Sequence, residues 1–82
     1  MYRDLHVLLE IAASDRVRVV ITLKDGVVFS GMSDGLDEGD DDLGWYFSDI
    51  IGYDYVNARF KDIASAYRID QPDIRWDAPA EE

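Results

Sequence analysis

The densest group of potentially reactive side chains is the acidic run Asp37-Glu38-Gly39-Asp40-Asp41-Asp42. Closely spaced carboxylates suit Ca²⁺, which takes about six to eight oxygen ligands. The spacing does not match an EF-hand loop, because counting from Asp37 puts Ser48 at the twelfth position, where that loop needs a bidentate glutamate. Counting from Asp40 puts Trp45 where the loop needs glycine. We predict no metal site, with calcium binding in another geometry as the alternative, and expect a solvated loop because like charges resist burial.

Two other patterns have the residue types of catalysis but lack the necessary partners. Asp40 and Asp42 are a carboxylate pair, yet acid–base work needs two environments that hold them in different protonation states, and one loop gives both the same water. Gly31-Met32-Ser33-Asp34-Gly35 matches the G-x-S-x-G motif, which requires a strand-to-helix turn and a later histidine. The single histidine, His6, lies upstream, where we expect a boundary position on a helix. We predict no catalytic residue, no cofactor and no enzymatic activity.

The composition narrows the class of protein further. The 82 residues include 18 acidic and 8 basic side chains, for a net charge of −10, and no cysteine. A chain of this length forms one small domain, and it has no thiol for a disulfide or a zinc site. No apolar stretch approaches the roughly 20 residues needed to cross a bilayer, and no signal peptide is recognisable, so we expect a cytoplasmic protein with no membrane contact.

The negative charge is concentrated in one region. Residues 25–54 carry nine acidic side chains and no basic one. Binding to a phosphate backbone needs clustered Lys and Arg, so direct contact with nucleic acid is not expected. Such a field instead speeds encounter with basic proteins.

Residues 2–13 are predicted to form a short helix. The apolar stripe at helical spacing consists of Leu5, Leu8, Leu9 and Ala12. Val7 and Ile11 are expected to widen this stripe. Ser14-Asp15 is expected to end the helix, because both side chains compete for backbone hydrogen bonds outside helices.

Residues 16–24 alternate apolar and polar side chains, which predicts a half-buried strand. Asp25-Gly26 follows, and then the β-prone residues 27–29, so we expect a hairpin with a type I′ turn. Gly31 interrupts the second strand, where a glycine often marks a bulge or the corner of a barrel.

The rest of the chain is predicted to contain the acidic loop at about 35–43 and then three strands. The first of these begins at residues 44–47, and the other two span 55–60 and 63–69. Alternation places Trp45 and Phe47 on one face and Tyr46 on the other. Residues 71–82 are expected to form an acidic C-terminal tail, which leaves 1–70 as the domain. The predicted fold is mainly β, with a short N-terminal α-helix followed by a five-stranded, strongly bent small barrel that hides its edges.

The segment from Leu23 to Gly31 resembles the first signature of the Sm-like family. The matching positions are Leu23, Gly26, Phe29 and Gly31, and Asp37 stands where the family often has an acid. The segment from Phe60 to Tyr67 looks like the second signature, in which a short turn leads into the final strand. The resemblance implies an SH3/Sm-like barrel, and the stretch from Glu10 to Gly26 is similar to Sm-like proteins that inhibit the termination factor Rho.

The RNA pocket of that family is not matched. The family places an aromatic residue or Met, followed by Asn, soon after the acid, whereas this chain has residues 38–42 of the acidic run there. Lys61-Asp62 replaces the Arg-Gly of the second signature. A splayed base then has no aromatic ring and no amide to hold it, so RNA binding does not carry over with the fold.

We therefore expect a small, non-enzymatic binding or regulatory module that contacts a basic protein, such as a nucleic-acid-binding protein, through region 34–47. Aromatic side chains beside acidic ones are favoured interface anchors. The predicted contact residues are Asp37, Glu38, Asp40, Asp41, Asp42, Trp45 and Tyr46. The alternative is an Sm-like RNA-binding or self-assembling ring subunit, in which edge strands pair between copies.

Overall fold

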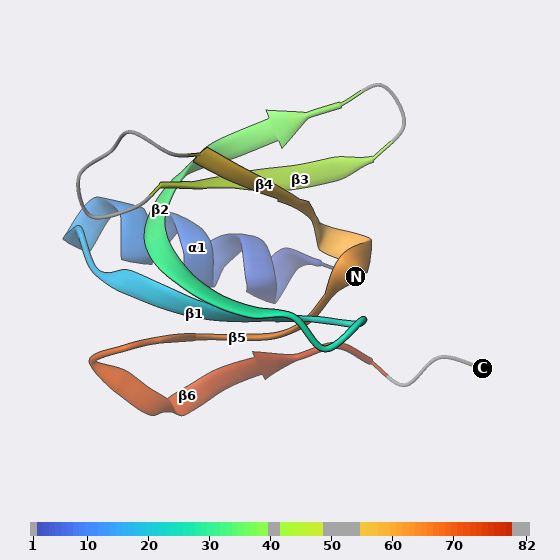
Figure 1. Ribbon diagram of the computed structural model, residues 1–82. Coiled ribbons are helices and arrows are strands. Elements are labelled where there is room, and N and C mark those ends of the chain that lie inside the picture. Colours follow the sequence, from blue (N-terminus) through green and yellow to red (C-terminus); the bar gives the residue numbers. More distant parts are fainter. Residues whose placement is uncertain (1, 40–41, 49–54, 80–82) are drawn as a thin grey trace.

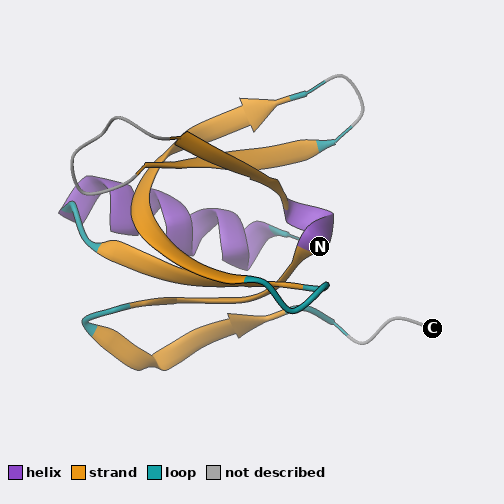
Figure 2. Cartoon of the chain, viewed as in Figure 1, coloured by secondary structure: helices purple, strands orange, loops and turns teal. Residues whose placement is uncertain are grey.

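The computed structural model describes residues 2–39, 42–48 and 55–79, and consists of one helix, six strands and one short 3₁₀ turn (Figures 1 and 2). In chain order the elements are α1 (Arg3–Asp15), β1 (Arg18–Leu23), β2 (Val28–Glu38), β3 (Leu43–Ser48), β4 (Tyr55–Arg59), η1 (Phe60–Asp62), β5 (Ile63–Arg68) and β6 (Gln71–Asp77). None of the described helices is long and apolar enough to cross a membrane.

The six strands form one antiparallel sheet with the order β4-β3-β2-β1-β5-β6. A mainly β fold with an N-terminal helix is therefore confirmed. The predicted five-stranded barrel is corrected to a strongly bent, six-stranded sheet that is not closed, with β4 and β6 at its edges. The additional strand is β6, whose residues we expected in the tail, because Trp76 is buried and anchors this segment beside β5.

Strand β2 is long and bent, and it belongs to both halves of the sheet (Figure 1). Its first half pairs with β1, and its second half, from Met32 to Glu38, pairs with β3. The bend brings Gly31 so close to β3 that an added Cβ would lie 2.8 Å from the carbonyl oxygen of Ser48. The predicted loop at 35–43 is therefore too long, because β2 continues as a strand through Glu38.

The first hairpin joins β1 and β2 as predicted, but the turn is not type I′. That turn needs positive φ at both central residues, and among the described residues only Arg16 and Gly26 have positive φ. Gly26 has φ +97 and donates its N–H to the carbonyl of Leu23 at 3.0 Å. The geometry is that of a longer turn that ends in a left-handed glycine, and the Asp25 carboxylate accepts from the Val27 N–H at 3.0 Å.

Helix α1 packs its Leu5, Leu9 and Ala12 into the core, and it ends at Arg16, whose φ of 57 is left-handed. Val7 and Ile11 do not widen the buried stripe, because they are 45% and 48% exposed. The helix touches β1, β2, β5 and β6, so one helix covers strands from both halves of the sheet (Figure 1).

A buried hydroxyl connects the helix with two strands. Ser33 Oγ donates to the carbonyl oxygen of Leu9 at 2.6 Å and accepts from Trp45 Nε1 at 2.7 Å. Both polar partners are thereby satisfied inside the core, which is required because unpaired buried polar groups cost about 1–3 kcal/mol each. The remaining core side chains are Val19, Ile21, Phe47, Ala58, Phe60, Ile63, Ala66 and Trp76.

The bend of β2 can be tested with two glycine substitutions. Gly31→Ala places a Cβ against the Ser48 carbonyl, so we expect a loss of roughly 1–3 kcal/mol in the free energy of unfolding. Gly35→Ala is the matched control, because no heavy atom lies within 4 Å of its added Cβ. Urea unfolding followed by circular dichroism measures both, and equal stability of the two variants would contradict the close approach.

Candidate functional site

The structure brings five of the seven predicted contact residues to the paired ends of β2 and β3. Asp37 and Glu38 close β2, Asp42 precedes β3, and Trp45 and Tyr46 lie on β3. Asp40 and Asp41 lie outside the described residues. The predicted site is therefore a strand hairpin with its acidic residues at the turn.

Asp37 does not stand free in solvent, because two side chains from β4 reach it across β3. The register aligns Asp37 with Gly44, and Gly44 with Arg59, in one row across the three strands. Arg59 Nη1 lies 2.9 Å from Asp37 Oδ2, and Asn57 Nδ2 donates to the same oxygen. The Asp37 side chain is only 12% exposed as a result.

Two glycines make room for this guanidinium. An added Cβ at Gly39 would lie 2.6 Å from Arg59 Nη1, and one at Gly44 would lie 3.1 Å from Arg59 Cδ. Arg59 also donates to the backbone carbonyl of Asp42 at 3.3 Å. We call Asp37, Asn57 and Arg59, seated on Gly39 and Gly44, the arginine clip.

The prediction that the whole acidic run is a solvated loop is thus wrong for Asp37 and Asp42, whereas Glu38 is exposed at the end of β2. Asp37 is bound in the arginine clip, and the Asp42 carboxylate lies 3.0 Å from Lys61 Nζ. The hydrogen bond from Lys61 to Asp42 raises the pKa of the Lys61 ammonium above its usual value. Both partners come from β4 and η1, far along the chain, so the acidic turn is held against the following strands.

Trp45 is also corrected as a contact residue. Its ring lies in the core, stacked against Phe60 with centroids 6.4 Å apart, and its indole N–H is used by Ser33. Tyr46 points the other way and is exposed, as alternation predicted. The accessible side chains that remain here, which we call the hairpin surface, are Leu36, Glu38 and Leu43 on the face of Trp45 and Tyr46 on the opposite face.

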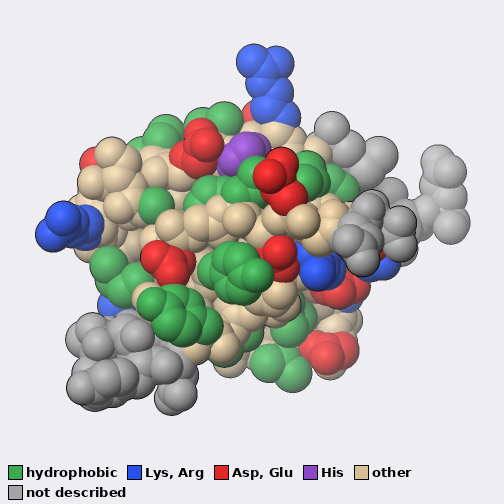
Figure 3. Space-filling model, turned by 90° about the horizontal axis from the view of Figure 1, so that it is seen from above, with side chains coloured by type: hydrophobic (Ala, Val, Ile, Leu, Met, Phe, Trp, Pro, Cys, Tyr) green, Lys and Arg blue, Asp and Glu red, His purple; other side chains and the backbone are tan. Residues whose placement is uncertain are grey.

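The view from above shows how charge and apolar side chains are mixed (Figure 3). Acidic side chains lie singly among hydrophobic ones, and some lie beside basic side chains. Among the described residues no three His, Asp or Glu side chains come together as a metal site. Ser33 of the G-x-S-x-G match faces the core, where its hydroxyl is fully engaged.

A second candidate surface, missed in the sequence, is a groove of about 440 Å³ between α1 and β6. Its lining combines Asp4, Val7, Leu8 and Ile11 of α1 with Arg68, Gln71, Ile74, Arg75, Trp76 and Asp77. Val7 and Ile11 share one side of α1 at helical spacing, but a core stripe has the same spacing, so no local signal distinguishes the groove from the core.

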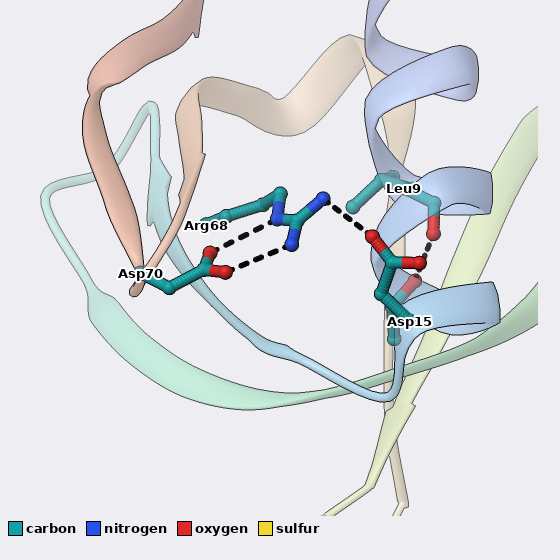
Figure 4. A network of polar contacts seen from close by, with 5 residues as sticks. Leu9, Asp15, Arg68 and Asp70 are labelled. Atoms are coloured by element: carbon teal, nitrogen blue, oxygen red, sulfur yellow. Dashed lines mark hydrogen bonds and ion pairs between the residues drawn. The ribbon is translucent and has the colours of Figure 1, made fainter.

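Arg68 fixes one end of this groove by joining β5 to the end of α1 (Figure 4). Its Nε and Nη2 donate to the two carboxylate oxygens of Asp70 at 3.0 and 2.9 Å, and its Nη1 donates to Asp15 Oδ2 at 2.8 Å. The hydrogen bonds from Arg68 hold the pKa of the Asp70 carboxyl below its usual value. The hydrogen bond to Asp70 likewise raises the pKa of Arg68.

Comparison of the chain with protein-family models, with curated proteins and with solved structures finds no match. The geometry of the two surfaces is therefore the basis for a function. The resemblance to the Sm-like family rests on signature residues alone.

The arginine clip can be tested by a double-mutant cycle. Asp37→Asn, Arg59→Gln and the double variant are expected to show a coupling of about 1 kcal/mol, because the Asp37 side chain is nearly buried. Asp42→Asn with Lys61→Gln is the matched control, for which we expect a smaller coupling because the pair is exposed to solvent. Urea unfolding measures both cycles, and an equal or larger coupling in the control pair would contradict the assignment.

The Asp70 carboxyl is predicted to titrate below the usual Asp value of about 3.9. Because its folded-state pKa is lowered, its contribution to stability is present above the unfolded pKa and is lost as the pH falls through the folded value. Carbon NMR of the Asp carboxyls measures this directly. In Arg68→Gln the pKa of Asp70 should return toward the usual value, and an unchanged titration in that variant would refute the stated cause.

Proposed function

We propose that this chain is a small, non-enzymatic acidic module that binds a basic protein partner in the cytoplasm through the hairpin surface. The observation that carries the proposal is a hairpin, held by the arginine clip, that pairs exposed Leu43 with exposed Glu38 on one face and exposes Tyr46 on the other. A carboxylate beside an apolar side chain, with an aromatic anchor on the same rigid element, suits a partner that has both basic and apolar side chains.

The distribution of cations supports a protein partner over nucleic acid. Each of the four Lys and Arg side chains between residues 55 and 79 has a carboxylate within 4.0 Å; these are Arg59, Lys61, Arg68 and Arg75. Phosphate binding would have to break these ion pairs inside a chain of net charge −10. A basic protein meets no such cost, and its approach is accelerated by the field.

The resemblance to the Sm-like family supports a regulatory reading of the same module. A helix before β1, the bent strand β2 and the order β4-β3-β2-β1-β5 agree with an SH3/Sm-like small barrel to which β6 has been added. Sm-like inhibitors of Rho act on a nucleic-acid-binding protein. We propose the same partner class here, with the acidic surface covering a basic site that otherwise holds nucleic acid.

Self-assembly is the second candidate function, and the open sheet favours it. Strands β4 and β6 end the sheet on its two sides, and each pairs with only one neighbour within the described residues. Free edges can pair between copies, and β4 is the better candidate because residues 72–74 of β6 bulge away from the ladder. Sedimentation velocity over a wide concentration range separates the two functions, because self-assembly predicts a rising mass and the binding module predicts a constant one.

The binding function is tested by capture from a lysate at two salt concentrations. The variant Glu38→Gln/Asp40→Asn/Asp41→Asn should lose the partners that the natural chain retains at low salt, because it removes three carboxylates from the acidic run. The variant Glu10→Gln/Asp62→Asn/Glu81→Gln changes the net charge equally at other positions of the sequence and is the control.

Three results would contradict the proposal. The first is equal loss of partners in both variants, which would assign capture to net charge alone. The second is unchanged capture by the hairpin variant at either salt concentration. The third is an electrophoretic shift of U-rich or A-rich RNA at micromolar protein, which would favour the RNA-binding alternative.

A further inference from the structure

The groove between α1 and β6 has an apolar floor that the fold leaves uncovered. Leu8 and Trp76 pack against the core at its base, and Val7, Ile11 and Ile74 line it while remaining 45%, 48% and 63% exposed. Large apolar side chains that gather in one hollow, instead of lying scattered, mark interaction sites. The volume of about 440 Å³ falls within the roughly 300–1,000 Å³ of ligand sites.

The rim of the groove is acidic once its ion pairs are taken into account. The two guanidiniums that line it are both occupied, Arg68 by Asp15 and Asp70 and Arg75 by Asp77. Asp4 adds another carboxylate in the first turn of α1. The lining and its ion-pair partners thus carry four carboxylates, those of Asp4, Asp15, Asp70 and Asp77, against two guanidiniums, and the floor beneath them is apolar. The complementary ligand has apolar side chains on one face and cations on the flanks.

The shape of β6 decides how such a ligand would lie. The pairing of β5 with β6 jumps from Tyr67↔Arg75 to Arg68↔Gln71, so residues 72–74 bulge away from the ladder. A bulge and a proline, here Pro72, are devices that protect an edge against strand addition. An incoming segment is therefore expected to rest its side chains in the groove rather than extend the sheet.

We propose that the groove between α1 and β6 is a docking site for a cationic amphipathic helix of a partner protein. The apolar face of that helix covers Val7, Ile11 and Ile74, and its Lys or Arg side chains meet Asp4 and Asp77. A second copy of this chain is disfavoured as the occupant, because each copy carries a net charge of −10. This site is separate from the hairpin surface and does not depend on it.

The test uses the full chain, labelled with ¹⁵N, and a synthetic Leu/Lys peptide about as long as α1 with its Leu at helical spacing. Amide shifts are expected at Val7, Ile11, Gln71 and residues 73–77. Val7→Ser/Ile74→Ser should weaken binding about tenfold or more, because both side chains are exposed in the free protein and become covered in the complex. Val28→Ser is the control, since that valine is 61% exposed and does not line the groove.

Two further arms separate apolar docking from simple charge attraction. A peptide of the same composition with scrambled order lacks an apolar face and should bind several-fold more weakly. Asp4→Asn/Asp77→Asn should weaken the ordered peptide at low salt while leaving the pattern of shifted amides unchanged. Val7→Ser/Ile74→Ser and Asp4→Asn/Asp77→Asn change exposed side chains and leave the buried core unaltered, so both variants are expected to fold.

The proposal is overturned if the ordered and scrambled peptides bind alike, if Val7→Ser/Ile74→Ser binds as the natural chain does, or if the shifts fall on residues 36–46. The hairpin variant Glu38→Gln/Asp40→Asn/Asp41→Asn should keep the groove shifts. If the natural chain binds no peptide in the groove but still captures partners through the hairpin surface, this site alone is refuted. If it binds the peptide in the groove but captures no partners, the hairpin function alone is refuted.

Discussion

The close approach of β2 to β3 at Gly31 is the constraint on which the rest of the structure depends. With no side chain there, β2 can turn toward the Ser48 carbonyl and serve both halves of the sheet as one continuous strand. The same turn points Ser33 inward, where its hydroxyl joins Leu9 of the helix to Trp45 of β3. The far end of β2 then carries Asp37 and Glu38 out of the core as part of a hairpin.

The carboxylates of this acidic chain are stabilised by ion pairs as well as by exposure to solvent. Asp37 and Asp42 are held by Arg59 and Lys61, whose positions follow from the antiparallel return of β4 beside β3. A glycine at the middle of the row lets a guanidinium cross the central strand, which a side chain at Gly44 would prevent. The acidic run thus has a structural part, which fixes the hairpin, and an exposed residue, Glu38, which belongs to the proposed binding surface.

Local patterns predict the helix and five of the six strands, and they fail where distant parts of the chain meet. The helix, the first hairpin and the inward faces of Trp45 and Phe47 follow from periodicity and turn chemistry. Acidic residues are depleted in strands, so β2 was ended too early, because no local signal showed that Arg59 would neutralise Asp37. For the same reason the buried role of Trp76 and the strand β6 were missed.

The same non-local dependence separates the two candidate surfaces. The hairpin surface could be predicted in part, because its residues are neighbours in the chain and its charge density is visible in the sequence. The groove could not, because Val7 and Ile11 look like core positions until β6 is placed, and β6 does not cover them. In a closed barrel with a short tail, no strand would lie opposite Val7 and Ile11. In the open sheet, β6 forms the second wall of the groove, and both side chains stay exposed. The extra strand therefore does more than lengthen the sheet: it turns one side of the helix into a groove, which is the proposed docking site for a cationic helix.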